Sequence, residues 1–471
     1  MQKSVLVELI RSLNKKEVRE LHKWLQSPSH NQRQDVIKLF DFLTKNLQQG
    51  DETTEKERAW AAIFKGEPYD DAFMRQVMYF LLKAMEEYLV FTDYTNDKVQ
   101  FQIALTRIYR MRKLEKAYKQ AHRTGTETLQ HQPLRNRYYL LQRFFLEQEE
   151  YEYKMSITQN ASVNLQEMSD AMEKWFIVEK LLIGNAMLAH HHVYQKANYD
   201  SGLLNEVLAY SSKHNLWDEP AIAANYFAYM AITNPNDKQY FDDLEKMILE
   251  SDDEYFTQPE MLNLYRTALN YCTAKVNQGE LDYSRRALKF YRKGVENGAL
   301  IENGVISRYT FGNAVGFAIK IGEFNWAEQF VERFQHFLEE KQRNSIINFN
   351  LSRLYFEKGD YNKAQRLLTQ FEYDDMILNI IAKTMLLKIY YERSDLDAFE
   401  SLIESLRIYL QRKEALNPAR KAAYKNLVSL MKKLLNLNIY SKVQKEKFRE
   451  LVLKTNPLTE REWFLKQLDG K

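Results

Sequence analysis

Apolar residues recur along almost the whole chain at steps of three and four residues, which places their side chains on one face of an α-helix. One such series is Leu262, Tyr265, Leu269, Cys272 and Val276. Alternating apolar and polar positions of useful length, the mark of a β-strand, are lacking. The prolines fall where these helices would begin or end. The pattern therefore predicts an all-α protein.

A short pattern repeats in the second half of the chain. Gly322-Glu323-Phe324 is followed 37 residues later by Gly359-Asp360-Tyr361 and 35 residues after that by Ser394-Asp395-Leu396, while Gly279-Glu280-Leu281 lies 43 residues before the first. A Gly or small polar residue permits a left-handed turn between two helices, and the apolar residue after it would fill the space between them. A lone helical hairpin cannot bury its apolar face, so the pattern predicts stacked hairpins.

The repeats resemble the tetratricopeptide repeat (TPR). The best copy, over residues 345–378, has the family's Leu, small, Tyr, Gly, Tyr and Ala positions filled by Leu351, Ser352, Tyr355, Gly359, Tyr361 and Ala364. The copy over 308–341 keeps Gly322, Phe324 and Ala327. Degenerate copies extend the resemblance to about 95–415, and in the copy over 98–131 Arg112 occupies the turn position that glycine fills elsewhere. The resemblance implies a right-handed α-solenoid of TPR-like hairpins over residues 96–415.

The two ends of the chain do not fit the repeat. Residues 1–95 are expected to form a separate helical module, in which Asn14 and Glu17 have the spacing of a capping box. This module resembles the N-terminal part of a group of uncharacterised bacterial proteins that carry a Ser-Pro-x-x-Asn turn, here 27–31. Residues 416–471 are expected to close the array as a helical cap.

Composition supports a helical protein and excludes several classes. The 471 residues include only 14 Gly and 8 Pro, 45% are hydrophobic and the net charge is +3. These values argue against collagen-like, low-complexity and disordered chains. The lone Cys272 leaves no disulfide framework. Glu8 and Arg11 interrupt the N-terminal apolar run, and no stretch approaches the ~18 apolar residues of a membrane helix, so a cytoplasmic protein without membrane partners is expected.

Charge is distributed unevenly. Residues 161–260 carry 6 basic and 17 acidic side chains, whereas residues 345–471 carry 23 basic and 16 acidic ones. One interpretation is that these are ordinary solvated helix surfaces. The other is that an acidic middle and basic ends face different partners. The basic excess is too small to favour nucleic-acid binding, although that binding stays open.

Candidate catalytic and metal-binding chemistry is sparse. The chain has no Gly-rich phosphate loop and no nucleophile elbow, so neither an enzyme nor a bound cofactor is expected. Residues 190–192 are three consecutive histidines, which spread around a helix and cannot share one metal ion. The carboxylate pairs 242–243, 252–253 and 374–375 are attributed to helix ends, where the helix dipole favours them.

The remaining candidate site is the concave groove that the TPR resemblance implies for binding peptides. The matching positions are His191, Tyr194, Tyr309, Phe349, Arg353, Phe356, Thr384 and Lys388. Arg353 and Lys388 are basic and one repeat apart, so they are predicted to take an acidic peptide or a C-terminal carboxylate. The family's full Lys/Asn carboxylate clamp is not present. Gly312 and Gly316 would allow either close packing of two helices or room for a ligand backbone.

Two functions are therefore expected. The first is a non-enzymatic scaffold or adaptor that binds a protein or peptide on the concave surface of the solenoid. The alternative is a peptide-responsive or nucleic-acid-binding regulator, with residues 1–95 as its effector module. This alternative is weakened because residues 1–95 show no clear recognition helix and a balanced charge.

Overall fold

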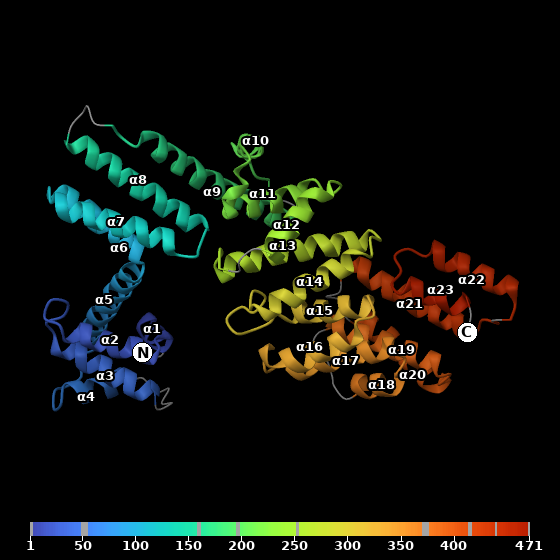
Figure 1. Cartoon of the computed structure of the whole chain (residues 1–471). Coiled ribbons are helices and arrows are strands. Elements are labelled where there is room, and N and C mark those ends of the chain that lie inside the picture. The colour runs from blue at the N-terminus through green and yellow to red at the C-terminus, as the bar shows by residue number, and fades with distance from the viewer. Residues whose placement is uncertain are drawn as a thin grey trace. The chain divides into compact units, whose positions relative to one another are not determined.

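The computed structural model describes residues 3–48, 55–157, 162–194, 198–250, 254–369, 376–412, 417–438 and 440–469. Within these ranges the regular structure is helical (Figure 1). The described residues also include a single isolated bridge between Glu302 and Val305. The prediction of an all-α protein is confirmed. None of the described helices combines the length and the apolar character needed to cross a membrane.

Contacts divide the chain into two compact units, each described by itself. The first comprises residues Met1–Ile183 and Ser201–Ile222, and the second comprises Gly184–Asp200 and Ala223–Lys471.

The first unit begins with five helices around one apolar core. They are α1 (Val5–Ser12), α2 (Lys15–Gln26), α3 (Gln34–Gln48), α4 (Lys56–Ile63) and α5 (Asp71–Asn96). Core side chains from α2, α3 and α5, including Leu21, Phe40 and Leu81, are at most 1% exposed. The capping box of α2 is confirmed: the Asn14 side chain accepts from the backbone N–H of Glu17, and the Glu17 carboxylate accepts from the Asn14 N–H.

The first unit continues with α6 (Lys98–Met111), α7 (Glu115–His131) and α8 (Arg137–Ile157), which pack against one another. Buried Glu149 on α8 accepts from Arg110 on α6 at 2.9 Å. The long α9 (Leu165–Val193) follows and extends past the boundary between the units, and α10 (Leu204–His214) completes the first unit together with a short 3-10 turn.

The second unit consists largely of consecutive helical hairpins. Its helices are α11 (Pro220–Thr233, which begins in the first unit), α12 (Lys238–Glu250), α13 (Gln258–Asn277), α14 (Tyr283–Glu296), α15 (Arg308–Lys320), α16 (Phe324–Phe334), α17 (Arg343–Glu357), α18 (Tyr361–Thr369), α19 (Met376–Glu392), α20 (Leu396–Arg412), α21 (Pro418–Leu435), α22 (Lys442–Lys454) and α23 (Arg461–Asp469). In the pairs α13/α14, α15/α16, α17/α18 and α19/α20 the two helices pack together, and α17 also packs against both α15 and α19 (Figure 1).

Five hairpin turns have the same backbone geometry. The left-handed residues are Lys113, Gly279, Gly322, Gly359 and Ser394, with φ of 57°, 96°, 79°, 79° and 58°. Each donates its N–H to the carbonyl three residues earlier, and the next N–H reaches the carbonyl five residues before itself, which satisfies two carbonyls at the helix end. The sequence pattern placed Arg112 at the first of these turns, but Lys113 adopts the left-handed conformation.

The last five helices of the second unit share a core. Leu387 of α19 and Phe399 of α20 are fully buried together with Met431 of α21 and Phe464 of α23. The described part of the C-terminal segment therefore packs directly on the α19/α20 hairpin and positions side chains against α19.

Candidate functional site

A cavity of about 200 Å³ lies between the first helices of consecutive hairpins, α15 and α17, and the first turn of α19. Its lining includes three of the residues that the sequence assigned to the groove, namely Tyr309, Phe349 and Arg353. The other lining residues are Arg308, Gly312, Asn313, Ile346, Asn350, Ile377 and Leu378. The stacking of α17 on α15 is what brings these residues together.

Arg353 reaches from α17 back to α15 because two glycines leave room there. Its Nη1 donates to the carbonyl of Gly312 at 3.3 Å, and a Cβ atom on Gly316 would lie only 2.9 Å from its Nη2. Gly316 and Arg353 each lie six residues before a left-handed turn glycine, Gly322 and Gly359, so they occupy equivalent positions in neighbouring hairpins. The glycine pair thus makes room for a cationic side chain in addition to allowing close helix packing.

The charge of Arg353 is poorly compensated. Within the described ranges no carboxylate oxygen lies within 4.0 Å of its guanidinium, and the centroid of the Phe349 ring is 5.8 Å away. Loss of solvation lowers the pKa of Arg353, while Glu357 and Glu460 oppose this effect from a greater distance. Arg353 is half-buried, and partial removal of a guanidinium from water is costly unless the group has an anionic partner. The cavity is therefore suited to an anion.

Asn350 provides a second polar group beside Arg353. Its side chain is 2% exposed, and its Nδ2 donates to the carbonyl of Ile346 at 2.8 Å. Its Oδ1 has no donor among the described residues and faces Gly312, where a Cβ atom would lie 3.7 Å away. A buried carbonyl oxygen of this kind can accept an N–H from a ligand.

The mouth of the cavity is aromatic and basic. Tyr309 is 68% exposed, and Arg308 donates to its hydroxyl at 2.8 Å while lying over its ring. Ser307 caps α15 immediately before Arg308 and so fixes where the helix begins. The site therefore combines an open aromatic entrance with a half-buried cation.

Three other residues that the sequence assigned to the groove do not line this cavity, namely Phe356, Thr384 and Lys388. Lys388 is 8% exposed, forms an ion pair with Glu460 at 2.8 Å and lies 4.7 Å from the centroid of the Phe356 ring. Thr384 is 2% exposed and donates to the carbonyl of Ile380. Because Glu460 from the C-terminal segment already neutralises Lys388, the two basic residues do not form an open pair.

His191 and Tyr194 lie at the end of α9, away from the residues that line the cavity. Both are exposed, and Nδ1 of the neighbouring His190 forms a hydrogen bond with the hydroxyl of Tyr199. The side chain of His192, like residues 252–253 and 374–375, lies outside the described residues. Where side chains are described, no three His, Cys, Asp or Glu residues are grouped to hold a metal ion.

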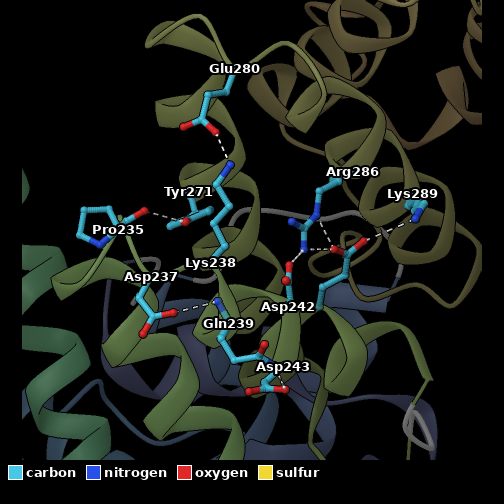
Figure 2. A network of polar contacts seen from close by, with 11 residues as sticks. Pro235, Asp237, Lys238, Gln239, Asp242, Asp243, Tyr271, Glu280, Arg286 and Lys289 are labelled. Atoms are coloured by element: carbon cyan, nitrogen blue, oxygen red, sulfur yellow. Dashed lines mark hydrogen bonds and ion pairs between the residues drawn. The ribbon is translucent and has the colours of Figure 1, made fainter.

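A second polar cluster, formed by α12, α13 and α14, has matched charges (Figure 2). Arg286 binds Asp242 at 2.6 Å and also binds Glu245, and its guanidinium lies 4.5 Å from the centroid of the Phe241 ring. Lys238 and the 4%-exposed Lys275 share Glu280, each at 2.9 Å. Because each of these cations has a carboxylate partner, the network stabilises the packing of the three helices.

Internal ion pairs also account for part of the acidic stretch 161–260. In the first unit Arg137 pairs with Glu179 at 3.2 Å, and Lys174 pairs with Glu219 at 2.6 Å. Together with Asp242 and Glu245, these carboxylates face cations of the same polypeptide. Part of the charge asymmetry along the sequence is therefore neutralised within each unit.

Arg308, Asn313 and Asn350 line the cavity but were not predicted from the sequence. Asn350 resembles any polar residue of a helix, and only its burial without a donor distinguishes it. One feature of the sequence could have indicated the cavity. Gly316 and Arg353 occupy equivalent positions in consecutive repeats, so the missing side chain of the glycine leaves room for the arginine of the next repeat.

Comparison of the sequence and structure with protein-family models, with curated proteins and with solved structures gave no match.

Proposed function

We propose that the protein is a non-enzymatic, cytoplasmic scaffold that binds a peptide carrying a carboxylate, and that its hairpins form a right-handed TPR-like solenoid. The observation that carries the binding proposal is the guanidinium of Arg353, held in a cavity without an ion-pair partner among the described residues. A carboxylate would accept hydrogen bonds from two of the three guanidinium nitrogens and offset the cost of removing this charge from water.

The rest of the cavity suits a peptide better than a cofactor. A volume of about 200 Å³ is below the roughly 300–1,000 Å³ of most small-molecule sites and fits about one residue. Phe349 and Ile346 provide apolar contact, and the Oδ1 of Asn350 can accept a backbone N–H. The exposed ring of Tyr309 is available for the preceding residue. The ligand carboxylate belongs either to the C-terminus of a peptide or to an Asp or Glu side chain.

The test uses the full-length protein and an array of fluorescent ten-residue peptides. One set ends in a free carboxylate, a second ends in an amide, and a third ends in an amide but contains one internal Asp or Glu. Fluorescence anisotropy should show saturable binding of the first or third set, and the comparison identifies the source of the carboxylate. Arg353→Gln should weaken that binding at least tenfold, because a charged hydrogen bond contributes about 1.5–3 kcal/mol.

The matched control is Arg285→Gln, since Arg285 is 75% exposed on α14 and makes only a long contact with Asp282. This variant removes the same charge and should leave affinity unchanged. Equal loss of binding in both variants, or equal binding of amidated peptides without acidic residues, would refute the carboxylate site. Turnover of a peptide by the purified protein would refute the non-enzymatic assignment.

A further inference from the structure

A second, larger cavity lies on the outer surface of the N-terminal five-helix core. It has a volume of about 490 Å³ and is bounded by Trp24 of α2 and by one face of α5. The α5 residues are Lys83, Glu86, Glu87, Val90, Phe91 and Tyr94, which follow the three- and four-residue steps of a helix face.

Its apolar part is exposed but well anchored. Val90 and Phe91 are 70% and 52% exposed. The Trp24 ring stacks on His30 at a centroid distance of 3.5 Å and lies 5.0 Å from the Phe91 ring, while the edge of Tyr88 packs against it from the core. Fixed aromatic side chains of this kind bind a partner with little loss of conformational freedom.

The polar part of this cavity is acidic, and its carboxylates have no cationic partner among the described residues. Neither Glu86 nor Glu87 makes an ion pair or hydrogen bond with any described residue, and the nearby Lys83 does not pair with them. Two carboxylates against one ammonium give the rim a net negative charge. This sign disfavours a phosphate backbone or an anionic membrane surface and favours a cationic partner.

We propose that this surface, which we call the Trp24–Phe91 surface, binds a segment of another protein in which Lys or Arg residues alternate with apolar residues. The apolar side chains would cover Val90 and Phe91, and the cations would pair with Glu86 and Glu87. Aromatic faces beside the carboxylates strengthen the attraction for a cation. The proposal concerns the first unit alone and does not depend on the Arg353 cavity.

The probe is a fluorescent twelve-residue peptide of alternating Lys and Leu, measured by anisotropy against the full-length protein at 150 mM salt. Two further probes are the same peptide with Glu in place of Lys and a single-stranded RNA of similar length. The Lys/Leu peptide should bind saturably and at least tenfold more tightly than either. Absence of saturable binding, or tighter binding of the RNA, overturns the proposal, and the RNA result would support a nucleic-acid-binding module instead.

Variants assign the contact to this surface. The double variant E86Q/E87Q and the single variant F91A should each weaken binding of the Lys/Leu peptide at least fivefold. The matched control is E55Q/E67Q, which removes two exposed charges of the same unit outside the cavity and should change the affinity less than twofold. Equal losses in E86Q/E87Q and E55Q/E67Q would show general charge attraction and overturn the proposal. Arg353→Gln should leave binding of this peptide unchanged, which separates the two sites.

Discussion

The guanidinium of Arg353 occupies the space that the missing side chain of Gly316 leaves on the neighbouring hairpin: a Cβ atom at Gly316 would lie 2.9 Å from Nη2 of Arg353. The contact joins two equivalent positions of consecutive hairpins. It places a cation between stacked helices, where apolar atoms usually pack, and this is why the cavity is proposed as a binding site.

Arg353→Leu is expected to stabilise the free protein. Leucine keeps most of the apolar stem and removes a cation whose desolvation is not offset by an ion pair among the described residues. The free energy of unfolding should rise by about 1 kcal/mol, seen as a higher urea midpoint by circular dichroism. A fall of comparable size would mean that Arg353 has a structural role, since a purely ligand-binding residue is not needed for folding.

The effect of Gly316→Ala on stability should depend on whether residue 353 is arginine or leucine. Alanine favours a helix interior by about 1 kcal/mol over glycine, but in the natural protein the new methyl group must displace the Arg353 side chain. We expect little net change with Arg353 present and a gain of about 1 kcal/mol in the Arg353→Leu background. Thermal unfolding of the four proteins of this double-mutant cycle measures the coupling.

Gly312→Ala is the matched control for this cycle. A Cβ atom there would meet only the Asn350 Oδ1, at an ordinary 3.7 Å. Its effect on stability should therefore be the same with and without Arg353. Coupling at both glycines, or at neither, would contradict the role assigned to Gly316.

Arg286→Gln should strongly destabilise the second unit. The substitution leaves the carboxylates of Asp242 and Glu245 without their shared cation, and Glu245 is only 13% exposed at its side chain. Breaking a partly buried network of this kind costs about 3 kcal/mol. Urea unfolding should show this loss, whereas the neighbouring Arg285→Gln should change the free energy by less than about 0.5 kcal/mol. Equal effects would show that the network in Figure 2 contributes little.

Asn14→Ala should weaken the N-terminal helical core by about 1 kcal/mol, because α2 loses the side-chain acceptor for its first N–H groups. Ser4→Ala is the control, since Ser4 precedes α1 in the same position but makes no capping hydrogen bond. Fluorescence-detected urea unfolding of the full-length protein allows the two variants to be compared. A larger effect at Ser4 than at Asn14 would contradict this assignment.

Cys272 should resist thiol reagents in the folded protein. Burial raises the pKa of its thiol to about 12, so at pH 8 almost none of it is the reactive thiolate. Ellman's reagent should release colour only as the protein unfolds in urea. Complete reaction within minutes under native conditions would show that α13 opens readily in the folded state.

Local structure followed from the sequence because its causes are local. The three- and four-residue spacing in Leu262 to Val276 gave a helix, and Asn14 with Glu17 gave a capping box. Gly279, Gly322, Gly359 and Ser394 were recognised as turn residues because few residues adopt a positive φ without strain. Arg112 was misplaced by one residue because Lys113, a residue without any left-handed preference, makes that turn.

The candidate sites were decided by packing between elements distant in sequence. Arg353 and Lys388 are both basic and lie one repeat apart, so the sequence does not distinguish them. Only Lys388 forms an ion pair with Glu460, which lies 72 residues after Lys388 in the sequence. Nothing local to Asn350 reveals that its Oδ1 lacks a donor, and Trp24 meets Phe91 only because α2 packs on α5. The sequence by itself determined which segments are helices, because that depends on neighbours within a few residues. Whether a charge is paired or open depends on side chains that only the tertiary structure brings together.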